Sequence, residues 1–126
     1  MAGLDQARIL LVDDEAAIRT TYTIILEQHG YSVTTAGSPA EAREAIAGGR
    51  FDLLICDLAL GEAENGLDVM SAAREREPSL PCVLLTGYPD TELPPGVSQN
   101  GVQVLFKPIE VPTILSTIDF LLRLRK

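Results

Sequence analysis

Short apolar runs alternate with amphipathic stretches along the chain. Four of these runs are almost entirely hydrophobic and end directly before a polar residue; they cover 9–12, 53–56, 82–85 and 102–106. A further run, 31–35, is rich in β-branched residues, which favour strands. Continuous apolar runs of this length are typical of strands that are buried on both faces of a sheet. The pattern therefore predicts five strands.

Helix signals separate most of the predicted strands. Residues 18–29 carry apolar side chains at helical spacing, and a glycine follows them. Residues 38–47 open with Ser-Pro-Ala-Glu, a capping box with proline at the first helical position, and paired glycines follow. An asparagine begins the stretch 65–77, and a last helix begins near Pro112. Strands that alternate with helices predict βαβ units, hence a parallel sheet with helices on both faces.

The alternation is interrupted between Thr86 and Val102. Residues 94–96 read Pro-Pro-Gly, and a proline costs roughly 3 kcal/mol inside a helix. A regular chain of this type would have its fourth helix here. We therefore predict a mostly irregular segment in which the fourth helix is degenerate or missing.

Length, charge and cysteine content narrow the class of protein. The 126 residues correspond to one domain, 1–126, and we expect no output domain. The net charge of −8 argues against nucleic-acid binding, and no apolar stretch approaches the ~18 residues of a membrane span. There is no signal-peptide pattern at the start. Cys56 and Cys82 lie in predicted strands outside any CxxC motif, so we expect reduced core thiols in a cytoplasmic protein.

Chemically active side chains follow four of the predicted strands. Asp13 and Asp14 follow the first apolar run, Asp57 follows 53–56, and Thr86 and Lys107 follow the last two runs. The carboxyl ends of parallel strands share one edge of the sheet, which is where ligands bind in open α/β sheets. We therefore expect three carboxylates, one hydroxyl and one ammonium to converge there.

Clustered carboxylates need a cation, because like charges a few ångströms apart cannot all ionise cheaply. Carboxylate oxygens are the ligands that Mg²⁺ prefers, and the metal keeps room for phosphate oxygens. Taken singly, an Asp-Asp pair often caps a helix and Lys-Pro is a common turn. Their joint occurrence with Asp57 and Thr86 at four strand ends predicts a phosphoryl-transfer site, in which Lys107 holds a phosphate oxygen.

These residues, in this order, resemble those of the receiver domain of two-component response regulators, a CheY-like superfamily, along essentially the whole chain. The resemblance implies a flavodoxin-like (βα)5 sheet of order 2-1-3-4-5. It implies that Asp57 accepts a phosphoryl group from a histidine kinase or histidine phosphotransfer protein. It also implies Mg²⁺ ligation by Asp14 and Asp57 directly, by Asp13 through water and by the backbone carbonyl of Ala59.

In the same resemblance, Thr86 and Lys107 hold the phosphoryl oxygens, and the Lys107–Pro108 peptide is cis. Such a receiver is not an enzyme in the usual sense, because it catalyses only its own phosphoryl transfer and dephosphorylation. It signals through protein–protein contacts. Apart from the histidine-containing donor, the resemblance identifies no partner.

Two departures from the family pattern concern the output. Val104 stands where the family usually has its switch aromatic, whereas Tyr88 lies two residues after Thr86. With Pro81 ahead of the fourth strand and no clear fourth helix, the stretch 86–88 resembles FATGY-type single-domain regulators, although the residues of 82–85 differ from that motif. The proline-bearing segment that follows resembles the receivers of hybrid histidine kinases. We expect Thr86 and Tyr88 to carry the conformational switch.

The last helix has more apolar residues than one packed face needs. Phe120, Leu121 and Leu124 extend its apolar surface beyond the stripe that faces the sheet, so we expect them to form a homodimer or partner contact.

Two other functions share the fold class. A haloacid dehalogenase-like phosphatase would need an Asp-x-Asp motif after the first strand and a cap domain, but the chain has the adjacent pair Asp13-Asp14 and no room for a cap. A flavodoxin-like FMN carrier would need a Gly/Ser/Thr-rich phosphate loop at the same place. Phosphomonoester turnover, or a yellow purified protein, would distinguish these from a receiver.

Overall fold

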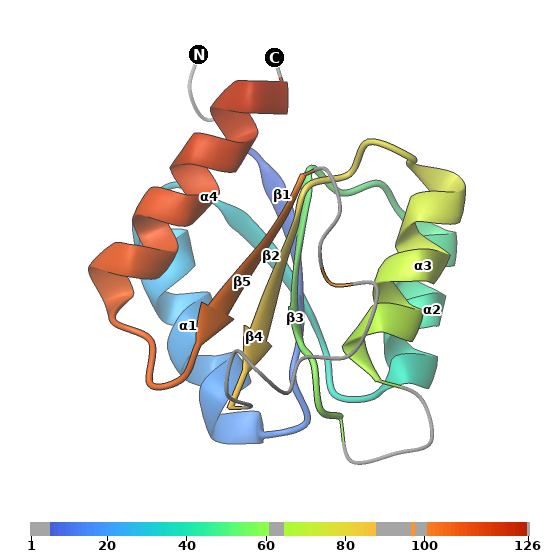
Figure 1. Cartoon of the computed structure of the whole chain (residues 1–126), viewed down its shortest axis with the longest axis horizontal. Coiled ribbons are helices and arrows are strands. Elements are labelled where there is room, and N and C mark those ends of the chain that lie inside the picture. Colours follow the sequence, from blue (N-terminus) through green and yellow to red (C-terminus); the bar gives the residue numbers. More distant parts are fainter. Residues whose placement is uncertain (1–5, 61–64, 88–96, 98–100, 126) are drawn as a thin grey trace.

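A computed structural model describes residues 6–60, 65–87, 97 and 101–125. Its five strands form one parallel sheet in the order β2-β1-β3-β4-β5, as predicted (Figure 1). The strands are β1 (Arg8–Val12), β2 (Ser32–Ala36), β3 (Leu53–Asp57), β4 (Cys82–Thr86) and β5 (Val102–Phe106). The helices are α1 (Ala16–Gln28), α2 (Pro39–Gly48), α3 (Gly66–Arg76) and α4 (Val111–Arg125).

The helices cover both faces of the sheet, with α1 and α4 on one side and α2 and α3 on the other (Figure 1). Alternate residues of β1 point to opposite faces: Leu10 and Val12 lie in the core cluster beside α2 and α3, and Ile9 and Leu11 lie in the cluster beside α1 and α4. Every residue of β3 and β4 is buried. This double coverage explains why the central strands read as continuous apolar runs.

Local sequence signals set where the helices begin and end. Gly30, with φ +89°, follows α1, and the Asn65 side chain accepts hydrogen bonds from the first turn of α3 within a complete capping box. The predicted box at Ser38 differs in one partner. Its hydroxyl accepts from Glu41 N–H at 3.2 Å, but the Glu41 carboxylate accepts from Gly37 N–H at 2.6 Å.

The apolar surface of α4 differs in one position from the prediction. Leu121 is buried against the sheet, in line with Ile114 and Ile118 at helical spacing, because these three residues share the inward stripe. Phe120 and Leu124 are 53% and 65% exposed, as expected.

The prediction of an irregular fourth segment falls almost wholly on residues outside the described part of the chain. Val97 is described within it and is buried in the same core cluster as Leu60 and Leu80.

The Lys107–Pro108 peptide is cis, as the resemblance implied. Among the described residues, no helix is long and apolar enough to cross a membrane.

Candidate phosphoryl-transfer site

The predicted carboxylates meet at the carboxyl edge of the sheet. Asp13 follows β1, Asp14 comes next, and Asp57 ends β3; one carboxylate oxygen of each lies within 4.8 Å of the others. Asp13 and Asp57 are only 0% and 4% exposed, whereas Asp14 is exposed. The cluster therefore has a buried floor and a side that is open to solvent.

Asp13 is held in place but only partly satisfied. Its Oδ1 accepts a hydrogen bond from Glu15 N–H at 2.9 Å, whereas its buried Oδ2 has no hydrogen-bond partner among the described residues. Burial raises the pKa of Asp13, and the negative charges of Asp57 and Asp14 raise it further, against the opposing effects of the Glu15 amide and Lys107. A buried carboxylate oxygen without a donor, beside two more carboxylates, fits a hard cation such as Mg²⁺.

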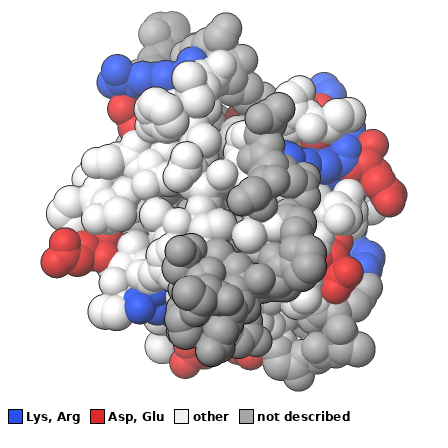
Figure 2. All heavy atoms as spheres, in the orientation of Figure 1, with Lys and Arg blue, Asp and Glu red and all other residues white. Residues whose placement is uncertain are grey.

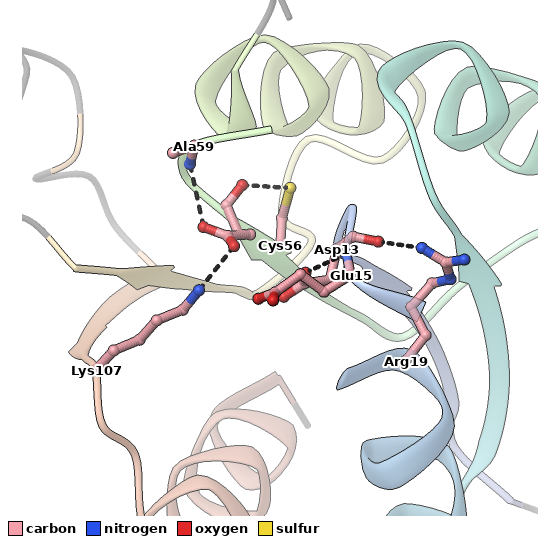
Figure 3. Close-up of polar contacts among 7 residues, drawn as sticks. Asp13, Glu15, Arg19, Cys56, Ala59 and Lys107 are labelled. Atoms are coloured by element: carbon pink, nitrogen blue, oxygen red, sulfur yellow. Dashed lines mark hydrogen bonds and ion pairs between the residues drawn. The ribbon is translucent and has the colours of Figure 1, made fainter. Parts of the chain in front are cut away.

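Asp57 is bound on both oxygens (Figure 3). Its Oδ1 accepts from Ala59 N–H at 3.1 Å, and its Oδ2 accepts from Lys107 Nζ at 2.8 Å. Burial acts to lower the pKa of Lys107, but the hydrogen bond and charge of Asp57 outweigh it and leave the pKa raised. Lys107 therefore remains an ammonium at neutral pH, next to the carboxylate.

Thr86 ends β4, the strand beside β3. In the ladder, Asp57 pairs with Leu85, so Thr86 lies one residue further toward the carboxyl edge, and it is buried. Its backbone carbonyl accepts from Lys107 N–H at 2.7 Å, which ties the ends of β4 and β5 together. The structure thus brings Thr86 and Lys107 to the edge that carries the acidic cluster. Tyr88, the predicted switch residue, lies outside the described residues.

Three residues shape the site without having been predicted to do so. Gly66 follows the helix cap, and a Cβ there would lie 2.6 Å from the Asp57 carbonyl oxygen. Arg19 donates from Nη1 to the Asp13 carbonyl at 2.7 Å (Figure 3), and Gly37 lies against its guanidinium. The glycines carry no side-chain chemistry, and the arginine occupies a helix position with no motif, so local pattern had no signal for them.

Both cysteines are buried free thiols, as predicted. Cys56 Sγ lies 3.4 Å from the Asp57 carbonyl oxygen. Burial, and then the charge of Asp57, raises the pKa of Cys56 well above its ordinary value. These thiols are therefore protonated core residues.

Comparison with known proteins identifies the family. The family model of the response regulator receiver domain matches residues 9–119 of the sequence, and the chain belongs to this family. The chain is 43% identical over 104 residues to the alginate biosynthesis transcriptional regulatory protein AlgB of Pseudomonas aeruginosa, which covers 82% of this chain and 23% of that protein.

Solved receiver structures have the same architecture. A response regulator receiver protein from Sinorhizobium medicae superposes with a TM-score of 0.88 at 28% identity, covering 98% of this chain and 99% of that one. TrrA of Thermotoga maritima, a response regulator protein solved in complex with Mg²⁺ and BeF, gives a TM-score of 0.78 at 27% identity, covering 92% and 99%.

Family, fold and site agree. The chain is a receiver domain, a phosphoacceptor of two-component signalling, and the phosphatase alternative has no support. AlgB, PgtA, ZraR, GlrR and QseF are longer proteins, and the chain spans between 18% and 29% of their length.

Proposed function

We propose that Asp57 is the phosphoacceptor and that Asp13, Asp14 and Asp57 hold Mg²⁺ together with the backbone carbonyl of Ala59. The observation that carries this assignment is the position of Asp57. Its buried carboxylate lies between the Ala59 amide and the Lys107 ammonium, with the other two carboxylates within 4.8 Å. The Mg²⁺ and BeF complex of TrrA, a neighbour with the same fold, supports a metal at this edge.

The reaction at Asp57 is an in-line displacement at phosphorus. An Asp57 carboxylate oxygen forms a bond to the phosphorus of a phosphohistidine donor, and the P–N bond breaks. The imidazole nitrogen keeps the electron pair and takes up a proton. When bound, Mg²⁺ neutralises charge that would otherwise repel the phosphoryl donor.

Lys107 and Thr86 act on the transferred group. Lys107 Nζ is already 2.8 Å from Asp57 Oδ2, so a small displacement brings it to an oxygen of the phosphoryl group. The Thr86 hydroxyl, at the end of the neighbouring strand, donates to another of these oxygens. With Tyr88, two residues further along the sequence, Thr86 then changes the packing beside β4 and transmits the phosphorylated state.

The partners follow from this chemistry. The donor is a histidine kinase or a histidine phosphotransfer protein, and the phosphorylated domain acts through contacts with other proteins. The net charge of −8 disfavours direct contact with nucleic acid by this domain. We place it in the cytoplasm and assign it no turnover beyond its own phosphoryl transfer and dephosphorylation.

The test uses acetyl phosphate, a small phosphoryl donor. With Mg²⁺, intact-mass measurement is expected to show a single phosphate adduct, which is lost in Asp57→Asn and after chelation of the metal. Asp52→Asn, a substitution at the opposite end of β3, is the matched control and should keep the adduct. An adduct of equal yield in Asp57→Asn would contradict the assignment.

A further inference from the structure

Arg19 connects the first helix to the acidic pair from the side opposite Lys107. It lies on α1, six residues after Asp13, and its half-buried side chain reaches back so that Nη1 donates to the Asp13 carbonyl oxygen at 2.7 Å (Figure 3). A hydrogen bond from a charged donor is worth more than one between neutral groups. It holds the backbone of Asp13 rather than its carboxylate.

Gly37 provides the space that this guanidinium occupies. A Cβ at Gly37 would lie 2.8 Å from Arg19 Nη1 and 3.1 Å from Cζ, closer than side chains approach one another. The backbone of Gly37 is outside the left-handed region, where only Gly30 and Gly101 lie among the described residues. Backbone conformation therefore does not demand glycine here, but the guanidinium can keep this position only while no Cβ is present.

Together these contacts immobilise Asp13 at three points. Its N–H donates to the Ala36 carbonyl at 3.1 Å, at the end of β2, its carbonyl accepts from Arg19, and its Oδ1 accepts from Glu15 N–H. The oxygen left over, Oδ2, is the buried one for which the described part of the chain offers no hydrogen-bond partner. The backbone contacts thus determine where this oxygen lies relative to Asp14 and Asp57.

We propose that Arg19, seated against Gly37, is a positioning residue of the Mg²⁺ site that holds Asp13 in the geometry the metal needs. This inference rests on the proposed function, in which the acidic cluster binds Mg²⁺. Arg19 acts through the Asp13 backbone, and groups that orient metal ligands in this way typically change metal affinity by 10–100-fold when they are removed.

Calorimetric titration of the metal-free chain with Mg²⁺ tests the proposal. Arg19→Gln is expected to weaken Mg²⁺ binding about tenfold. Gly37→Ala is expected to weaken it to a similar extent, because the new methyl displaces the guanidinium while every other hydrogen bond of Asp13 remains. The double variant should bind no more weakly than Arg19→Gln alone, since both substitutions break one contact.

Two matched controls separate this effect from a general loss of structure. Gly48→Ala adds a methyl that has no atom of the described residues outside its own helix within 4 Å, and Arg50→Gln removes an arginine whose side chain is 80% exposed. Both should retain the wild-type affinity. In acetyl phosphate labelling of Arg19→Gln, the half-saturating Mg²⁺ concentration should rise more than the limiting rate falls, which a simple loss of folded protein would not produce.

Other results would overturn either the positioning role of Arg19 or the proposed metal site. Unchanged Mg²⁺ affinity in folded Arg19→Gln and Gly37→Ala, or additive effects in the double variant, would overturn the positioning role. If Arg19→Gln fails to fold, Gly37→Ala decides the question alone, because the three atoms nearest to its methyl all belong to the flexible end of Arg19. Wild-type protein that does not bind Mg²⁺, or Asp14→Asn that binds as tightly as wild type, would overturn the proposed metal site itself.

Discussion

At the residue scale, Asp13 is a residue of the acidic cluster that lowers the stability of the folded protein. Its pKa is raised above 3.8 by burial, so the folded protein holds this proton more tightly than the unfolded chain. Ionisation at neutral pH therefore costs folding stability, and none of the residues described in the structure donates a hydrogen bond to Oδ2 to offset the cost. Such groups persist in functional sites because the ligand needs them.

Asp13→Asn is therefore expected to be more stable than wild type by about 1 kcal/mol in chelator at neutral pH, because the amide keeps the shape and removes a clustered charge. Added Mg²⁺ should stabilise the wild type, to which it binds only in the folded state, and should stabilise the variant less. Urea unfolding with chelator and with Mg²⁺ measures both effects. A variant that is less stable than wild type in chelator would show that the carboxylate is satisfied.

Cys82, which lies outside the acidic cluster, makes the folding stability depend on pH. Burial raises its pKa from 9.0 to about 11, against the lowering effect of Arg74. The folded state retains the thiol proton in this interval while the unfolded chain loses it, so stability falls as pH rises from 9.0 to about 11. The loss from this one thiol approaches about 2 kcal/mol. Cys82→Ala should show a shallower decline in urea midpoint across this range, and parallel declines would contradict the prediction.

At the element scale, the start of α3 packs directly on the end of β3. Gly66 N–H donates to the Leu58 carbonyl at 2.9 Å, and a Cβ on Gly66 would meet the Asp57 carbonyl oxygen at 2.6 Å and Leu58 Cα at 2.9 Å. These are backbone atoms, which cannot turn aside as a side chain would. The close approach therefore couples the position of α3 to the backbone of Asp57.

Gly66→Ala is expected to lower stability by about 2 kcal/mol through overpacking, and to slow labelling of Asp57 by acetyl phosphate because its backbone must shift. Chemical denaturation and labelling rates measure the two effects. Gly48→Ala, whose methyl contacts no other element in the part of the chain that the structure describes, is the control for an added methyl. Wild-type stability and labelling in Gly66→Ala would mean that α3 moves away at no cost.

At the scale of the whole molecule, α4 and β5 leave a largely uncharged surface. Figure 2 shows few charged side chains over these two elements on this face. Phe120 and Leu124 of α4 and Phe106 of β5 are 53%, 65% and 42% exposed. Phe120 and Leu124 are four residues apart on α4 and so share a helix face. Exposed apolar residues favour association, and a second copy of the chain is the partner we test.

We expect the wild type to self-associate through α4, and Phe120→Glu with Leu124→Glu to abolish the association by placing charges in the contact. Light scattering over a concentration series, with and without acetyl phosphate, measures it. Ile24→Glu, at an equally exposed apolar position on α1, is the matched control and should behave as wild type. A wild-type protein that stays monomeric at high concentration in both states excludes the homodimer.

The sequence by itself determined the elements, their order in the sheet and which polar side chains meet at its carboxyl edge. Apolar runs and caps are local signals. The sequence predicts Asn65 as the cap of α3, and its side chain does cap that helix; β5 has the bounds that its apolar run predicts. Residues that follow parallel strands must meet at one edge, so Asp13, Asp57 and Lys107 were predictable as neighbours without coordinates.

Only the tertiary structure decided which of these groups are buried and what holds them. Asp13 and Asp14 are adjacent and chemically identical, yet one is fully buried and the other exposed, because burial depends on the elements packed around the strand end. The seating of Arg19 against Gly37 joins residues far apart in the chain by the reach of a long side chain. No local pattern encodes such contacts, since they arise where separately determined elements pack together.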